Sequence, residues 1–275
     1  MRDLLYSIIL GIFQGITEFI PVSSSGHLVL ARSVLPGFEV PGLMFDVILH
    51  GGSLLAVFVY FKKDLAWFFK GIKGNLSNHH NTNAQSWVKG IIIGTIPAGL
   101  IGVLAHDWFE NLFKHPLTVS FTLCCTGIIL ILGEIVQKRK SNRADSSDFI
   151  SVKMALWVGC MQSLALIPGI SRSGSTIAAG MAGNWSREKA TRFSFLLMIP
   201  AVAGAVALKA KDVPQFIAEG HIDILALIAG FIASFLAGYL SIAFLLKIIR
   251  KYSFVPFGIY CIFIGLISLL VQTAY

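Results

Sequence analysis

Two short segments of this 275-residue chain combine ionisable and hydroxyl side chains with helix-breaking residues, inside otherwise apolar sequence. The first runs from Gln14 to His27 and the second from Pro168 to Thr176. A charged side chain at the centre of a bilayer costs about 2.5–3.5 kcal/mol on insertion scales, so such residues mark functional sites by default. The candidate site residues are Gln14, Glu18, Ser23, Ser24, Ser25, His27, Ser171, Arg172, Ser173, Ser175 and Thr176.

The second segment has the composition of a phosphate-binding site. Arg172 carries a planar fork of N–H donors that matches phosphate oxygens. The surrounding serine and threonine hydroxyls add donors, and a helix that restarts after Gly174 directs free backbone N–H groups at the same point. In the alternative interpretation, Arg172 pairs with Glu18 and joins the two segments without binding a ligand.

The first segment could carry out the chemistry. His27 can take or give a proton near neutral pH, and Ser24 is a candidate nucleophile. Glu18 lies one helical turn after Gln14, so the two side chains share a helix face. Glu18 could orient His27, hold a divalent metal ion, or both. Alternatively, the serines act only as helix caps after a tight turn.

The composition predicts an all-α polytopic membrane protein with a single domain, residues 1–275. Hydrophobic residues make up 55% of the chain and charged residues only 13%, which is far more apolar than a soluble domain. Asp46 and Glu134 lie in apolar segments, and a structural or a functional role is open for each. The four cysteines have no metal-ligand spacing. Six transmembrane helices are predicted, at about 42–61, 86–106, 117–136, 188–208, 222–246 and 254–272.

Two broken segments are too short to span a membrane comfortably. The first consists of a helix over 4–20 that stops at Pro21 and a helix over 27–35 that ends at Pro36. The second covers about 152–184 and is interrupted at 168–176. Backbone of this kind is tolerated at membrane depth only where protein buries it or it lines a wet cavity. We therefore predict two re-entrant helix-loop-helix hairpins.

The two hairpins belong to an internal repeat with an offset of 148 residues. The first copy covers about 1–136 and the second about 150–275, and each hairpin is followed by three spans. Because three is odd, the second copy is inverted relative to the first, an arrangement that forms sites near the midplane. Matched pairs include Gly11 with Gly159, Gln14 with Gln162, Ser23 with Ser171, Ser25 with Ser173 and Gly26 with Gly174.

The basic residues set the expected orientation. Most Lys and Arg residues lie in 62–89, 138–153, 187–192 and 247–251, which the positive-inside rule places in the cytoplasm, with both termini outside. This distribution explains the net charge of +8 without a nucleic-acid partner. Residues 62–73 are expected to form an interfacial helix and 74–84 a polar loop.

The sequence resembles the bacterial undecaprenyl-pyrophosphate phosphatases linked to bacitracin resistance. The likeness rests on Gln14-x-x-x-Glu18, Pro21-Val-Ser-Ser-Ser-Gly-His27, Pro168-Gly-Ile-Ser-Arg-Ser-Gly-Ser-Thr176 and Phe193-Ser-Phe-Leu-Leu-Met-Ile-Pro200, and it extends along the whole chain. The family has Gln or Glu at the first motif position, so Gln14 is within its range. The usual catalytic candidates of the family correspond to Glu18, Ser24, His27 and Arg172.

The resemblance implies hydrolysis of undecaprenyl diphosphate to undecaprenyl phosphate and inorganic phosphate, on the outer side of the bacterial cytoplasmic membrane. This reaction would recycle the lipid carrier for cell-wall synthesis and confer bacitracin resistance. A divalent cation, Mg²⁺ or Ca²⁺, is implied as cofactor, with Glu18 and Gln14 as its candidate ligands. Whether Ser24, His27 or water attacks is open, as is a homo-oligomeric state. The alternative function is a carrier or flippase for polyprenyl phosphate lipids, since inverted repeats with broken helices are also transporter architecture.

Overall fold

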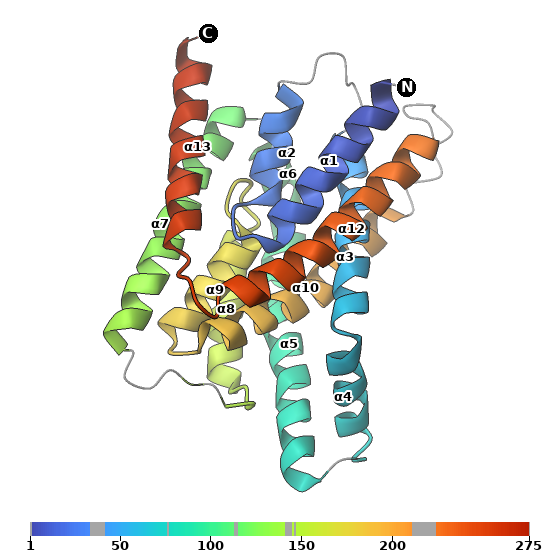
Figure 1. Cartoon of the computed structure of the whole chain (residues 1–275), viewed down its shortest axis with the longest axis vertical. Coiled ribbons are helices and arrows are strands. Elements are labelled where there is room, and N and C mark those ends of the chain that lie inside the picture. Colours follow the sequence, from blue (N-terminus) through green and yellow to red (C-terminus); the bar gives the residue numbers. More distant parts are fainter. Residues whose placement is uncertain are drawn as a thin grey trace.

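The computed structural model describes residues 2–33, 42–75, 77–112, 115–140, 145, 147–210 and 224–274. Across these residues the regular secondary structure is helical (Figure 1). The helices are α1 (Arg2–Phe19), α2 (Ser24–Ser33), α3 (Gly42–Tyr60), α4 (Lys62–Ile72), α5 (Asn78–Leu104), α6 (His106–Leu112), α7 (Pro116–Lys140), α8 (Val152–Leu164), α9 (Arg172–Ala182), α10 (Arg187–Ala210), α12 (Ile224–Ile248) and α13 (Val255–Ala274).

The helix lengths confirm an all-α polytopic membrane protein. Among the described residues, α5, α7, α10, α12 and α13 are each long and apolar enough to cross a membrane. Helix α3 meets the same test together with α4, to which it is joined at a bend of 68°. These helices match the six predicted spans. The N- and C-terminal ends lie at one end of the molecule, and the turn between α4 and α5 lies at the other (Figure 1).

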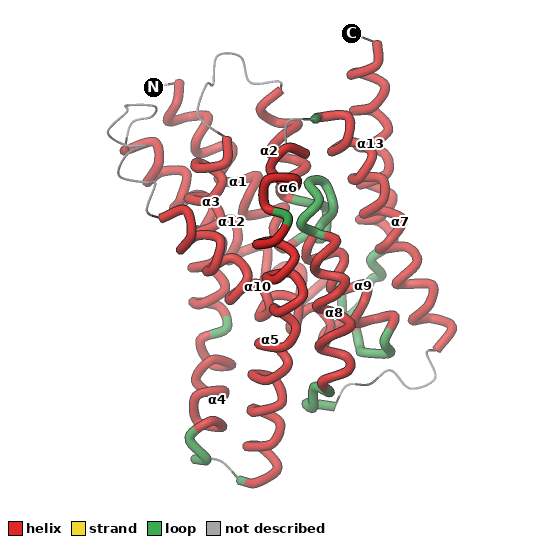
Figure 2. The backbone as a smooth tube through the Cα atoms, turned by 180° about the vertical axis from the view of Figure 1, so that it is seen from behind, coloured by secondary structure: helices red, strands yellow, loops and turns green. Residues whose placement is uncertain are grey.

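The two predicted hairpins correspond to α1–α2 and α8–α9. Figure 2 shows that the loop joining α8 to α9 lies between the two ends of the molecule, next to α2. The tips of the hairpins meet, because the Gly169 backbone N–H donates to Ser25 Oγ at 3.3 Å. Each tip also builds the same helix cap: Ser23 Oγ accepts from the Gly26 N–H at 3.2 Å, and Ser171 Oγ accepts from the Gly174 N–H at 3.0 Å.

Two local expectations are wrong. Residues 78–84 are helical, because the long helix α5 starts at Asn78, well before its apolar part, and Gly71 of α4 packs against Ala84. Helix α2 starts at Ser24 rather than at residue 27, because Ser23 caps it. The predicted helix end at Pro36 and the predicted first residues of the span 222–246 lie outside the described residues.

Glycine pairs bring each hairpin into close contact with one span. A Cβ atom on Gly11 of α1 would overlap the Gly230 carbonyl oxygen of α12. A Cβ atom on Gly159 of α8 would overlap the Gly94 carbonyl oxygen of α5. Such contacts require glycine because no side-chain atom fits between the helix backbones. Since Gly11 and Gly159 are matched by the offset of 148, these contacts are those that two equivalent halves would make.

We predict that Gly159→Ala lowers the thermal unfolding midpoint of the purified protein in detergent, because over-packing costs about 1–3 kcal/mol. Gly99→Ala is the matched control, since Gly99 also lies inside a helix but no atom lies within 4 Å of the position that its Cβ would take. Equal midpoints for the two variants would contradict the close contact between α8 and α5.

Candidate functional site

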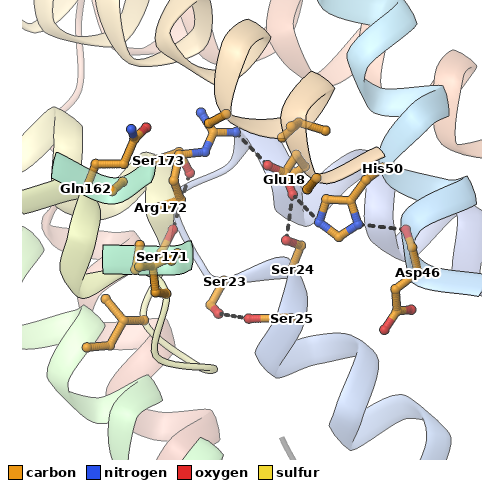
Figure 3. Close-up of a pocket in the computed structure, with 18 of the residues that line it drawn as sticks. Glu18, Ser23, Ser24, Ser25, Asp46, His50, Gln162, Ser171, Arg172 and Ser173 are labelled. Carbon is orange, nitrogen blue, oxygen red and sulfur yellow. Dashed lines mark hydrogen bonds and ion pairs between the residues drawn. The ribbon is translucent and has the colours of Figure 1, made fainter. Parts of the chain in front are cut away.

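A cavity of about 390 Å³ opens where the two hairpin tips meet (Figure 3). Residues of α3, α5, α6 and α10 complete its wall beside both hairpins. Its polar and charged lining residues are Thr17, Glu18, Ser23, Ser24, Ser25, Asp46, His50, Gln162, Ser171, Arg172, Ser173 and Lys209. The structure therefore brings most of the predicted site residues together around one space.

Glu18 is the centre of the hydrogen-bond network in this cavity. Its side chain is 5% exposed. Oxygen Oε2 accepts from Ser24 Oγ at 2.7 Å and from Gln14 Nε2 at 3.0 Å, whereas Oε1 accepts from Arg172 Nη2 at 2.5 Å. A buried carboxylate needs such partners, because desolvation of an unpaired charge is expensive. The contact with Ser24 also places a proton acceptor directly on the candidate nucleophile.

Arg172 crosses from the second hairpin to the first. Arg172 is the first residue of α9, directly after the N-cap Ser171. Its Nη1 donates to the backbone carbonyl oxygen of Ser194 on α10 at 2.9 Å. Its other terminal nitrogen, Nη2, makes the ion pair with Glu18. The Arg172–Glu18 ion pair, which the sequence analysis gave as the alternative to phosphate binding, is thus present. Arg172 also lines the cavity.

His50 is a site residue that the sequence interpretation missed. Its Nδ1 lies 2.7 Å from the backbone carbonyl oxygen of Asp46. A carbonyl oxygen only accepts hydrogen bonds, so Nδ1 carries a proton. The other nitrogen, Nε2, therefore faces Glu18, at 3.4 Å from Oε2. The signal was available, since His50 is an ionisable residue inside the predicted span 42–61, where a functional role is the default.

Four predicted site residues lie outside the cavity lining. Gln14 is buried in α1, where its Nε2 donates to Glu18 Oε2 at 3.0 Å. His27 points to α13, where its Nε2 lies 2.9 Å from the Tyr260 hydroxyl. Ser175 is 1% exposed inside α9, and its hydroxyl has no hydrogen-bond partner among the described residues. Thr176 Oγ1 makes a hydrogen bond with Ser194 Oγ at 2.6 Å, and this bond joins α9 to α10. The last two point away from the tip because successive residues of α9 rotate around the helix.

The other charged groups near the site divide into two classes. Asp46 lines the cavity and is paired with Arg32 of α2, whereas Lys209 lines it from the end of α10. Lys209, one residue beyond the predicted span 188–208, is a second cation of the cavity. Glu134, by contrast, is fully buried away from the cavity, pairs with Arg187 and accepts from the Phe254 N–H at 3.2 Å. Glu134 is therefore structural.

The residues present do not form a ready cation site. Among the described residues, no three His, Cys, Asp or Glu side chains are grouped as metal ligands. Both Glu18 oxygens already accept hydrogen bonds, and Arg172 places a positive charge 2.5 Å from one of them. Within the described part of the chain, Gln14 Oε1 is buried without a hydrogen-bond partner, but one neutral oxygen falls short of the ligand set that Ca²⁺ or Mg²⁺ takes.

Comparison with known proteins identifies the family. The family model described as "Bacitracin resistance protein BacA" matches residues 7–267. The chain belongs to this family. It is 43% identical to a protein of Methanosphaera stadtmanae over 99% of both chains, and 40% identical to one of Methanobrevibacter smithii over 96% of both. Each of these BacA-like relatives is named "Undecaprenyl-diphosphatase". A relative from Shouchella clausii, named "Undecaprenyl-diphosphatase 1", is 36% identical over 99% of this chain and 98% of its own.

We predict that Glu18→Gln and Arg172→Gln each lower the thermal unfolding midpoint, and that the double variant recovers most of the loss. Each single change leaves one buried charge unpaired, which costs about 3–5 kcal/mol. Arg250→Gln is the control, because it breaks an exposed pair with Glu188, with side chains 65% and 41% exposed, and should change little. A double variant less stable than either single variant would rule out direct pairing of the two buried charges.

Proposed function

We propose that the chain is an integral-membrane phosphatase that hydrolyses undecaprenyl diphosphate to undecaprenyl phosphate and inorganic phosphate. The observation that carries this proposal is the 2.7 Å contact from Ser24 Oγ to Glu18, beside Arg172 and inside a cavity of sufficient size for a diphosphate. The names of the relatives and the bacitracin-resistance family support it. The activity recycles the lipid carrier for cell-wall synthesis.

The reaction follows from the hydrogen-bond directions in the cavity. Glu18 takes the proton of Ser24 as Oγ attacks the terminal phosphorus, and the bond from that phosphorus to the bridging oxygen breaks. The lipid monophosphate leaves, and a phosphoserine remains. Glu18 gives the proton it received to the departing lipid phosphate. Water then attacks the phosphorus of the phosphoserine with Glu18 as the base, and the bond from phosphorus to Ser24 Oγ breaks. Oγ takes the proton from Glu18, so that inorganic phosphate is released and Ser24 is restored. His50 lies on the same Glu18 oxygen and can pass a proton to or from it.

Arg172 stabilises the charge that develops on the phosphate. Its guanidinium can donate two parallel hydrogen bonds to oxygens of the transferred phosphoryl group. In this arrangement the terminal phosphate replaces Glu18 as the partner of Nη2. Lys209 adds a positive charge to the cavity from the C-terminal end of α10, beyond the apolar side chains of residues 201–206. Ser24, Glu18 and Arg172 thus place the attacking oxygen, its base and a counter-charge around one point, as phosphoryl transfer requires.

The wall of the cavity formed by α5 and α10 suits the isoprenoid end of the substrate. Small and apolar side chains line it there: Ala98, Ala201, Val202, Ala205 and Val206. An isoprenoid chain can pass from the bilayer to this wall without exposing its apolar surface to water. The arrangement gives the cavity a polar end for the diphosphate and an apolar end for the lipid.

A carrier for polyprenyl phosphate lipids remains the second candidate, because two broken helices meet inside the molecule. A carrier needs the cations and hydroxyl donors of the cavity. It has no need for a carboxylate that accepts the proton of a serine. The Ser24–Glu18 contact therefore favours the phosphatase.

Ser24→Ala is expected to lower phosphate release from undecaprenyl diphosphate in detergent by about a thousandfold or more, since it removes the nucleophile. Ser25→Ala is the matched control, because Ser25 lies in the same turn but bonds Ser23 and Gly169 instead of Glu18. It should keep activity within about tenfold. Near-parental release by Ser24→Ala would mean that water attacks directly, with Glu18 as its base.

The location of the protein is proposed to be the bacterial cytoplasmic membrane, with both termini and the cavity on the outer side. The basic loops motivate this orientation. An impermeant maleimide added to intact cells should label Thr273→Cys near the C-terminus, and Ser77→Cys before α5 only after permeabilisation; both positions are exposed. The parent, with its four native cysteines, sets the background. The opposite labelling pattern would reverse the orientation.

A divalent cation, Mg²⁺ or Ca²⁺, is proposed to arrive on the diphosphate rather than to reside in the protein. Mg²⁺ usually keeps several waters and binds substrate phosphates, and both Glu18 oxygens already accept hydrogen bonds in the substrate-free cavity. Calorimetric titration of the substrate-free protein with Mg²⁺ should therefore detect no site tighter than about 0.1 mM. Tight binding without substrate would contradict this proposal. A homo-oligomer also stays a prediction, which the mass of the detergent complex tests.

A further inference from the structure

His27 is held between its own hairpin turn and the last helix, α13. Its Nδ1 lies 2.8 Å from the backbone carbonyl oxygen of Ser23, and its Nε2 lies 2.9 Å from the Tyr260 hydroxyl. The two rings are also stacked, with centroids 5.6 Å apart and planes within 9°. The side chain of His27 is buried, and the cavity that holds Ser24 and Glu18 is lined without it.

These contacts leave neither ring nitrogen of His27 with a free lone pair for proton transfer. The Ser23 carbonyl only accepts, so Nδ1 must carry a proton and donate it. In the neutral ring, Nε2 then accepts from the Tyr260 hydroxyl; in the charged ring, Nε2 donates to it. In neither form can His27 take the proton of Ser24, which already points to Glu18.

The carbonyl that His27 binds belongs to a residue in an unusual conformation. Ser23 has a φ of +73°, in the left-handed region that residues other than glycine rarely adopt. Its hydroxyl accepts from the Gly26 N–H, so both ends of the turn are fixed around Ser24. A residue in this region keeps its conformation only when its surroundings hold it there, and such residues cluster at active sites.

The second hairpin shows an independent solution to the same problem. There, Gly169 has a φ of +89°, and its carbonyl accepts from Thr126 Oγ1 at 2.9 Å. The preceding carbonyl, of Pro168, accepts from Thr122 Oγ1 at 2.5 Å. Both threonines lie on α7, and α7 packs along α13. Each hairpin tip thus has a left-handed residue whose carbonyl is held by a side chain, either on a neighbouring span or bonded to one.

We propose that His27 is a positioning residue with Tyr260 as its anchor: together they hold the Ser23 carbonyl so that Ser24 Oγ points at Glu18. This inference rests on the proposed role of Ser24. It predicts that any side chain able to donate from the position of Nδ1 replaces His27 in part. Asparagine does so, because its amide nitrogen is separated from Cα by the same number of bonds as Nδ1 of histidine.

The test compares His27→Ala, His27→Asn and Tyr260→Phe in phosphate release, with Tyr252→Phe, at an exposed tyrosine, as the control. We expect His27→Ala to lower kcat by about a hundredfold, since misplacement of a reacting group by 1 Å can cost that much. We expect His27→Asn to recover activity to within about tenfold of the parent, and Tyr260→Phe to lower kcat several-fold with unchanged KM and an unchanged pH profile. If His27→Asn is folded and as inactive as His27→Ala, or if either conservative variant loses a limb of the pH profile, the positioning role is wrong.

Amide hydrogen exchange separates failure of this inference from failure of the proposed function. If the parent chain releases no phosphate, the proposed function fails, and the exchange rates alone then decide the inference. Tyr260→Phe should speed exchange at the amides of Ser24–Gly26 by about fivefold or more, because the turn opens more readily. Tyr252→Phe should not change these rates. Unchanged exchange in Tyr260→Phe would overturn the inference even if activity fell.

Discussion

A helix that ends inside a membrane must find partners within the protein for the backbone groups it exposes. Both hairpins of this chain meet that requirement at their tips. Thr122 and Thr126 of α7 bond the carbonyls of Pro168 and Gly169, and the Ser171 N–H returns a bond to Thr126 at 2.9 Å. The first tip relies on side chains at Ser23 and His27. These turns border the cavity, and side chains of the protein supply hydrogen bonds to their backbone groups.

The buried charge of Glu18 is the second consequence of that arrangement. A carboxylate with 5% exposure is stable only with counter-charge and hydrogen bonds, which Arg172, Ser24 and Gln14 supply. The same contacts are those that phosphoryl transfer uses: an acid–base group on the nucleophile and a guanidinium beside it. In the proposed reaction, the groups that stabilise the Glu18 charge are therefore already oriented for phosphoryl transfer.

The internal repeat explains how a symmetric scaffold can hold an asymmetric site. Ser24 and Arg172 occupy equivalent positions, since they are separated by the offset of 148, and both donate to Glu18. The flanking serines keep matching contacts in the two copies: Ser23 to Ser25 at 3.3 Å and Ser171 to Ser173 at 3.2 Å. The repeat thus provides two similar turns. The difference at one position provides a hydroxyl group, the proposed nucleophile, on one side and a cation on the other.

Much of this protein could be predicted from short-range patterns in the sequence. Apolar runs of membrane length indicate the spans, Pro21 and Pro168 interrupt the two hairpins, and the matched glycines and serines indicate the repeat. These features depend on a few neighbouring residues and on the membrane as solvent. Only the tertiary structure decided which histidine faces Glu18. His27 is three positions from Ser24, yet the docking of α2 turns it towards Tyr260 on α13. His50 is 32 positions from Glu18, and the packing of α3 against α1 brings it to the carboxylate, because the rotation of one helix about another depends on contacts along their whole lengths.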